Sequence, residues 1–191
     1  MRQSAGRHNT RRRKSTRRRK STRRRKSTRR RSKQGGLFQR DQLNVLYNKI
    51  LLVDGQDLTG RPDLYADMPE INISPIKDPN DTYLVTLTDP DAPAGIWVHY
   101  VIIIKSTGQK EKIFYQYQPP NPPPNSGIHR YIFRAYPLKY KVLPKDNHSE
   151  INKKDGHLYY MQELEPLIKN LQPQMSLQFT VKAPSFLKQE L

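Results

Sequence analysis

Two acidic residues and two histidines in this chain have the types and the setting needed to form a small polar site. Asp89 and Asp91 lie in the segment Asp-Pro-Asp-Ala-Pro, which ends at Pro93, and histidines follow at His99 and His129. The two prolines fix the backbone φ angles of this segment, so the carboxylates can hold a partner at a small entropic cost. A carboxylate beside an imidazole fixes the tautomer of the ring and favours its charged form. These residues therefore predict a pocket that binds a ligand through hydrogen bonds.

Each of these residues alone also has a simpler interpretation. Asp-Pro is a common way to open a turn, and a single histidine in an apolar strand is more often a hydrogen-bonded core residue. Asp89 and His99 could also form an acid–base pair, or the acids and histidines could bind a metal in a hydrolase. However, no serine or cysteine stands in a recognisable nucleophile elbow. We therefore predict a binding protein that is not an enzyme and that uses neither a metal nor another cofactor.

The order of these motifs resembles that of the phosphatidylethanolamine-binding protein family, which includes the Raf kinase inhibitor proteins and the plant flowering regulators. That family carries an Asp-Pro-Asp-x-Pro motif, a histidine on the next strand and a Gly-x-His-Arg motif, here Gly127 to Arg130. The similarity covers residues 50–182, is strongest over 83–136, and looks especially like the plant branch over 121–130. The resemblance implies a non-enzymatic binding and regulatory protein that modulates kinases or proteases.

The resemblance also implies a small cavity that accepts phosphate, acetate or a phosphoethanolamine headgroup. Carried over position by position, the expected lining residues are Asp89, Pro93, Trp97, His99, Pro122, Pro123, His129 and Tyr131, with Asp91 at the rim. The imidazoles and the tyrosine hydroxyl would donate hydrogen bonds to phosphate oxygens, and Asp89 would accept from a histidine or from a ligand ammonium group. The bond between Ala92 and Pro93 is expected to be cis. Five residues separate Pro93 from His99, where the family usually has more, so we expect one side of the cavity to be open.

Hydrophobic periodicity predicts a mostly β body. Alternating or continuous apolar segments favour strands at 71–73, 83–88, 97–104, 113–117, 129–136 and 177–181. The nearly all-apolar segment 97–104 is typical of a strand covered on both faces. Loosely helical patterns predict helices at 37–52 and 156–171, the second limited or kinked by Pro166. The fold class that this pattern predicts, and that the resemblance also implies, is a β-sandwich with short peripheral helices.

The N-terminal segment differs in composition from the rest of the chain. Positions 1–34 carry 18 of the 35 Lys and Arg residues and no acid, so the remaining 17 bases balance all 17 acids. Residues 11–28 repeat Arg-Arg-Arg-Lys-Ser-Thr three times. Dense like charge without apolar side chains cannot offset the entropy of ordering, which predicts disorder. We therefore expect a basic tail at residues 1–36 and one folded domain at residues 37–191.

A polycationic tail of this kind suggests a second function. Residues 1–34 can neutralise the phosphates of a nucleic acid, and because no aromatic residues are interleaved we expect non-specific contact. Packaging of nucleic acid, including in a virion, is therefore an alternative function. Nuclear import and anchoring on an anionic membrane are other uses of the same charge, and the serines and threonines that follow basic residues match basophilic kinase substrates. A solubilising or incidental repeat is the simplest interpretation.

The composition also bears on where the protein resides. The chain has no cysteine, so it can form neither a disulfide framework nor a thiolate metal site, which suits a reducing compartment. No apolar signal-peptide core follows the N-terminal charges, and no segment reaches the roughly 18 apolar residues that a membrane span needs. We therefore predict an intracellular, cytoplasmic protein that is neither secreted nor transmembrane, with nuclear or virion association through the tail.

Overall fold

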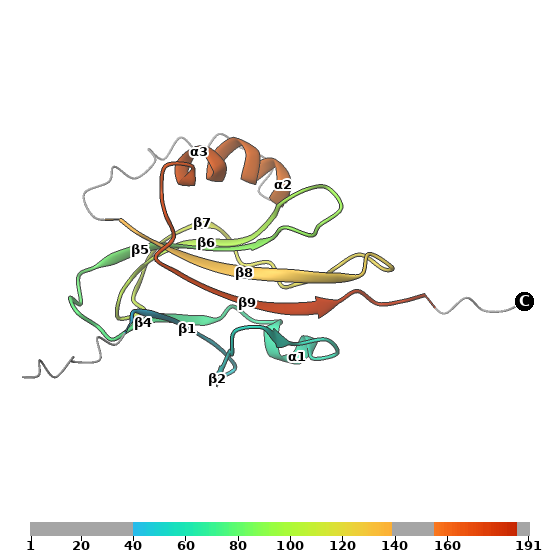
Figure 1. The fold of residues 1–191 in the computed structure, drawn as a ribbon, viewed down its shortest axis with the longest axis horizontal. Helices are drawn as coiled ribbons and strands as arrows, with labels where there is room; N and C mark the ends of the chain where they lie inside the picture. The colour runs from blue at the N-terminus through green and yellow to red at the C-terminus, as the bar shows by residue number, and fades with distance from the viewer. Residues whose placement is uncertain (1–39, 139–154, 187–191) are drawn as a thin grey trace, which may run out of the picture. The chain divides into compact units, whose positions relative to one another are not determined.

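The computed structural model of the chain describes residues 40–138 and 155–186, so the predicted tail at residues 1–36 lies outside the described residues. Within the described ranges the strands form two sheets, which confirms the mostly β prediction (Figure 1). The small sheet has the order β2-β1-β4 and consists of β1 (Gln42–Tyr47), β2 (Ile50–Leu51) and β4 (Glu70–Ser74). The large sheet has the order β3-β9-β8-β5-β6-β7 and consists of β3 (Gln56–Asp57), β9 (Met175–Lys182), β8 (Ile128–Pro137), β5 (Thr82–Asp89), β6 (Trp97–Lys105) and β7 (Lys110–Tyr115). Its strand pairs are antiparallel except for β3 with β9.

The large sheet is the middle of three layers (Figure 1). One face packs on the small sheet, through a core whose fully buried side chains include Val45, Leu87, Phe133 and Phe179. The other face packs on the helical segment through side chains that include Leu84, Val101, Ile103 and Leu164. Adjacent residues of β6 point to opposite faces and both are buried, as Ile102 and Ile103 illustrate. The prediction that segment 97–104 is a strand covered on both faces is therefore confirmed.

The helix predicted over residues 37–52 is wrong, because its described part is a β-hairpin. β1 pairs antiparallel with β2, and the two residues between them, Asn48 and Lys49, have φ angles of 50° and 66°. Positive φ at both central positions is the geometry of a two-residue hairpin turn of type I′. The buried side chains of β1 alternate as Leu43, Val45 and Tyr47. The two residues of β2 are apolar but exposed, and they follow β1 after only two residues. The apolar positions of both strands together therefore give a sequence pattern like that of one face of a helix.

The helix predicted over residues 156–171 is confirmed over its first part. It consists of α2 (Gly156–Tyr159), a π-helical turn η1 (Tyr160–Leu164) and α3 (Glu165–Ile168). Asp155 caps the N-terminus, where its carboxylate accepts a hydrogen bond of 2.9 Å from the backbone N–H of Leu158. The π turn ends two residues before Pro166, whose missing N–H and ring disturb an ordinary α-helical ladder. The wide turn thus lets the segment continue past the proline.

The other predicted strands are confirmed as β4, β5, β7, β8 and β9, with small differences at their ends. The largest difference is at β7, which spans Lys110–Tyr115 rather than 113–117. No helix within residues 40–138 and 155–186 is long and apolar enough to cross a membrane.

Candidate functional site

The ends of three neighbouring strands lie side by side in the large sheet and bring the predicted polar residues together. β5 lies between β6 and β8 and is antiparallel to both. The last residue of β5, Asp89, therefore lies beside the first residues of β6 and β8, and it pairs directly with Trp97. His99 follows on β6, and His129 and Tyr131 follow on β8. Segments that are remote in sequence thus supply one site.

A cavity of about 320 Å³ opens at these strand ends, and we call it the strand-end cavity. Its lining includes six of the predicted residues, namely Asp89, Pro93, Trp97, His99, Pro123 and Tyr131. Five further lining residues were not predicted: Ala92, Ala94, Gln118, Pro119 and Asn121. The last three are Gln118 and two residues of the proline-rich segment 119–125, in which the prolines restrict the backbone.

Three predicted residues lie elsewhere. Asp91 faces Arg130 instead of the cavity. Pro122 lines a neighbouring groove that also includes Pro62 and Pro184. His129 is fully buried and lies behind Asp89, away from the lining. His129 and Pro122 are thus not among the residues that line the strand-end cavity.

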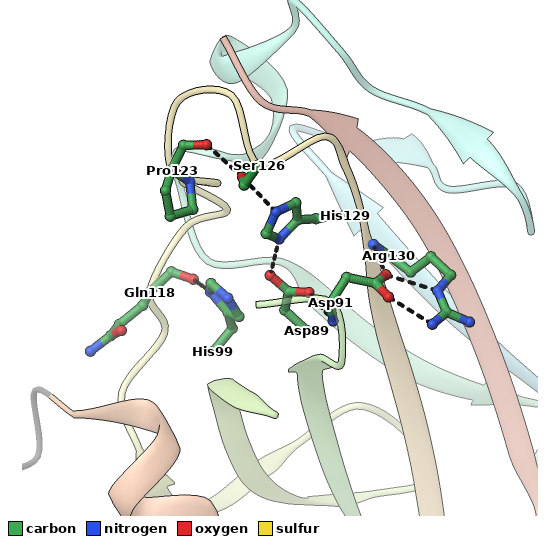
Figure 2. Close-up of polar contacts among 8 residues, drawn as sticks. All are labelled: Asp89, Asp91, His99, Gln118, Pro123, Ser126, His129 and Arg130. Carbon is green, nitrogen blue, oxygen red and sulfur yellow. Dashed lines mark hydrogen bonds and ion pairs between the residues drawn. The ribbon is translucent and has the colours of Figure 1, made fainter. Parts of the chain in front are cut away.

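Asp89 is held by a chain of hydrogen bonds that passes through His129 and Ser126 and ends at Pro123 (Figure 2). Its Oδ2 is 2.7 Å from Nδ1 of His129, and Nε2 of that ring is 2.7 Å from Oγ of Ser126. The hydroxyl of Ser126 donates in turn to the backbone carbonyl of Pro123 at 2.5 Å. Because a carbonyl only accepts and a hydroxyl has a single hydrogen, Nε2 of His129 must be the donor to Ser126. Nε2 of His129 therefore carries a hydrogen, and Nδ1 of the same ring forms the hydrogen bond of 2.7 Å with the side chain of Asp89.

Asp91 and Arg130 fasten the Asp-Pro-Asp loop to β8 (Figure 2). The guanidinium donates to both carboxylate oxygens at 2.8 Å, and the backbone N–H of Arg130 donates to Oδ2 at 2.9 Å. These hydrogen bonds from Arg130 hold the pKa of the Asp91 carboxyl below its usual value. A backbone N–H of the same loop, that of Asp91, donates to Oδ1 of Asp89 at 2.8 Å. The two acids thus have separate tasks: Asp91 fixes the loop, and Asp89 faces the cavity.

The bond between Ala92 and Pro93 is not cis; within the described residues the cis bond is Ser74–Pro75. The short segment after Pro93 closes a β-turn, in which the N–H of Gly95 donates to the carbonyl of Ala92 at 2.9 Å. Pro93 is the second residue of this turn, a position that suits a trans proline, whereas a cis proline takes the third position. The shortness of the loop thus accounts for the difference.

His99 is neutral, which corrects the expectation that a nearby carboxylate would favour its charged form. Burial lowers the pKa of its ring, and this effect exceeds the opposing effects of the Gln118 carbonyl and of Asp89. Nδ1 of His99 lies 2.9 Å from the backbone carbonyl oxygen of Gln118 (Figure 2). Since that oxygen can only accept, Nδ1 carries the hydrogen. Nε2 is then an unprotonated acceptor, and it makes no hydrogen bond to any described residue.

Tyr131 places a phenol on the cavity wall. Its ring packs edge-on against His99, with the centroids 5.1 Å apart. The residue is fully buried, and its hydroxyl has no hydrogen-bond partner of standard geometry within the described residues. Burial, followed by the charge of Asp89, raises the pKa of this hydroxyl, so it stays protonated at neutral pH. A buried hydroxyl without a partner is uncommon in proteins, and a ligand in the cavity would satisfy it.

The helical segment supports the cavity from the other face of the large sheet. Nε1 of Trp97 donates to the side-chain oxygen of Gln118 at 3.4 Å. Gly156 at the start of α2 lies so close to this indole that a Cβ atom there would be 2.6 Å from Nε1 of Trp97. His157 contacts the β-turn, where a Cβ atom on Gly95 would lie 2.7 Å from its ring. Because these contacts require glycine at both positions, the helix and the cavity loop fit each other closely.

A metal site was an alternative interpretation of the acids and histidines. Within residues 40–138 and 155–186 no three His, Asp or Glu side chains are grouped so that they could hold a metal ion. In the described part of the chain these residues instead hydrogen-bond to one another and to the backbone.

The fold agrees with the family that the sequence motifs indicate. A family model described as phosphatidylethanolamine-binding protein matches residues 48–170, so the chain belongs to this family. The fold is similar to that of a carboxypeptidase Y inhibitor in complex with its cognate proteinase, with 20% sequence identity, a TM-score of 0.55 and coverage of 75% of this chain and 83% of that chain. It is also similar to a phosphatidylethanolamine-binding protein from Plasmodium vivax, with 18% identity, a TM-score of 0.55 and coverage of 74% and 85%. At these identities the likeness establishes the fold.

Proposed function

We propose that this protein is a non-enzymatic binding and regulatory protein whose strand-end cavity takes a small anion or a phospholipid headgroup such as phosphoethanolamine. The observation that supports this function best is the unpartnered Tyr131 hydroxyl, which lines the cavity together with Asp89 and His99. The cavity volume of about 320 Å³ is within the range of small-molecule sites. Rigid prolines on two sides reduce the ordering that binding would require.

A titration with phosphoethanolamine tests this function. We expect saturable changes in the ring signals of His99, which lines the cavity, and of His129, which is hydrogen-bonded to Asp89. The Tyr131→Phe variant removes the unpartnered hydroxyl and should weaken binding by about tenfold. Tyr160→Phe is the matched control, because Tyr160 packs in the helical layer. Unchanged histidine signals at millimolar ligand would show that the cavity is not a binding site.

Regulation of a protease or a kinase is the cellular activity that we propose for the domain. The similar fold of an inhibitor that is complexed with its proteinase supports a protease as partner. Addition of this protein to carboxypeptidase Y, with peptide hydrolysis as the readout, is a direct first test. Inhibition at micromolar protein would support the proposal, and full activity would remove this protease from the candidates.

A second function rests on the charge of the N-terminal segment. Eighteen basic residues and no acid within positions 1–34 favour non-specific binding to nucleic acid, for packaging or in a virion. If about ten of these residues contact phosphates, the logarithm of the affinity should fall with the logarithm of salt concentration with a slope of about −9. Deletion of residues 1–34 should abolish retention on DNA and leave the melting temperature of the domain unchanged. Equal retention of the truncated protein would contradict this function, and binding to anionic vesicles or to an import receptor alone would assign the tail another role.

A further inference from the structure

Away from the strand-end cavity, one methionine holds its sulfur against two hydrogen-bond donors. Met68 lies between α1 (Pro62–Tyr65) and β4, and it is 41% exposed. Its Sδ accepts hydrogen bonds from the hydroxyl of Tyr100 on β6 at 2.8 Å and from Nζ of Lys110 on β7 at 3.4 Å. None of the three residues lines the strand-end cavity. We call this group, Met68, Tyr100 and Lys110, the thioether cluster.

Tyr100 supplies the donor on the buried side of the sulfur. The residue is fully buried in the core between the two sheets, and its hydroxyl donates to Met68. Burial raises the pKa of this hydroxyl to about 12, so it keeps its hydrogen at neutral pH. A thioether sulfur is only a weak acceptor. An oxygen in its place would therefore satisfy the buried hydroxyl better.

Lys110 supplies the donor on the solvent side. The residue is exposed at the start of β7, and its ammonium group forms no ion pair with a carboxylate among the described residues. An ammonium group has three N–H donors and no acceptor. A reagent that reaches the sulfur of Met68 from solvent therefore meets a proton donor beside it.

We propose that Met68 is a modification site, at which hydrogen peroxide oxidises the thioether to the sulfoxide with Lys110 as proton donor. A lone pair of the sulfur forms a bond to one peroxide oxygen, and the O–O bond breaks. The sulfur loses two electrons, which the peroxide gains. The departing hydroxide takes a proton from Lys110 and leaves as water, and the hydroxyl on sulfur then returns a proton to Lys110. The inference does not depend on the proposed function.

The thioether cluster is also suited to hold the product. A sulfoxide usually disrupts packing, because a polar oxygen enters apolar surroundings. At Met68 the new oxygen would accept hydrogen bonds from Tyr100 and Lys110, the donors that already contact the sulfur. The same loop is held nearby by Tyr117, whose hydroxyl donates to the carbonyl of Tyr65 at 2.6 Å. Oxidation should therefore fasten the loop between α1 and β4 rather than release it.

The other methionines provide internal controls. Met161 in η1 is 51% exposed, more than Met68, and its sulfur has no hydrogen-bond donor among the described residues. Met175 on β9 is buried in the core, and Met1 lies outside the described residues. Exposure alone predicts that Met161 reacts faster than Met68. The thioether cluster predicts the reverse order.

Oxidation of the full-length protein by dilute hydrogen peroxide, followed by mass spectrometry of its peptides, tests the order. Met68 should react about tenfold faster than Met161, which is less than a positioned donor supplies in an enzyme, because Lys110 is exposed. Lys110→Gln should bring the rate at Met68 close to that at Met161, whereas Lys182→Gln, at the exposed end of β9, should change neither. A rate at Met68 no higher than at Met161, or one unchanged by Lys110→Gln, would overturn the inference.

Thermal melts of the reduced and oxidised protein test the product, with Met161→Leu as background so that its oxidation does not contribute. Oxidation should leave the melting temperature unchanged or raise it. In Tyr100→Phe the sulfoxide lacks its buried donor, so oxidation should lower the melting temperature by roughly 2–4 °C. Tyr115→Phe is the matched control, because Tyr115 is equally buried but packs against the helical segment. If Tyr100→Phe fails to fold, Lys110→Gln removes the other donor and takes its place. A clear drop on oxidation in the background protein, or an equal response of Tyr100→Phe and Tyr115→Phe, would contradict the inference.

Discussion

Nδ1 of His129 and Oδ2 of Asp89 lie 2.7 Å apart, although the two residues are 40 positions apart in sequence. Both side chains are almost completely buried. The contact joins the end of β5 to the start of β8, and it holds the carboxylate that faces the strand-end cavity. A buried carboxylate is stabilised only with a partner of this kind.

Loss of that partner should destabilise the domain strongly. His129→Leu leaves the buried Asp89 carboxylate without its hydrogen-bond partner, and we expect a loss of about 3–5 kcal/mol in the free energy of unfolding. Urea denaturation measures it. In the double variant Asp89→Asn with His129→Leu no unpaired charge remains, so part of the loss should be recovered. If the double variant lost as much unfolding free energy as Asp89→Asn and His129→Leu lose in sum, the two residues would act independently.

The clamp between Asp91 and Arg130 should make a small contribution that depends on pH. Because the folded-state pKa of Asp91 is lowered, its stabilisation is present above the ordinary carboxyl pKa and is lost as pH falls through the folded-state value. Both side chains are partly or fully exposed, so Asp91→Ala should lower the melting temperature at neutral pH by roughly 2–4 °C at most. In strong acid the variant and the original protein should melt alike. A difference that grows on acidification would contradict this account.

Gly95 should tolerate no side chain. Its φ angle is 101°, and a Cβ atom would lie 2.7 Å from the ring of His157. We expect Gly95→Ala to destabilise the domain by about 1–3 kcal/mol, measured by thermal or urea unfolding. Gly55→Ala is the matched control, since Gly55 has a φ of 78° and no neighbour within 4 Å of its Cβ position. The excess of the first loss over the second measures the contact with α2, and equal losses would show that this contact is unimportant.

His99 should make the domain less stable in mild acid. Its pKa is lowered by burial in the folded state, so the unfolded chain binds the proton first, and stability falls as pH drops below the ordinary histidine value of about 6.5. His99→Gln cannot titrate and keeps a side-chain amide donor for the carbonyl of Gln118. The difference in unfolding free energy between the two proteins should therefore change in favour of the variant from about pH 7 to about pH 5. A constant difference would mean that His99 has an ordinary pKa.

The sequence predicts a strand reliably where one long apolar segment forms it, and less reliably where two short strands adjoin. Segment 97–104 is predicted correctly because an almost continuous apolar run of this length is typical of a strand buried on both faces. Segment 37–52 is mispredicted, since a short hairpin with an exposed apolar edge gives a pattern close to that of a helix. Within the described residues, local periodicity thus fails where two short strands meet at a tight turn.

The sequence likewise predicts some features of the candidate site and not others. Motif order groups Asp89, His99 and Tyr131, and the structure places all three on the lining of the strand-end cavity. His129 lies behind Asp89 instead, because a residue close to a strand end can pack against the loop that follows the neighbouring strand, and sequence spacing does not distinguish the two positions. The tautomer of His99 could not be predicted at all, since it is set by a backbone carbonyl that any residue at position 118 would supply.

The close fit of Gly156 against Trp97 has a consequence for regulation. The indole is part of the cavity wall, yet its back is supported by a helix on the opposite side of the sheet. A macromolecule that displaced that helix would make the cavity wall more mobile, and a ligand that ordered the wall would hold the helix in place. Ligand binding in the cavity and binding of a macromolecule to the helix would then be reciprocally coupled through the single side chain of Trp97.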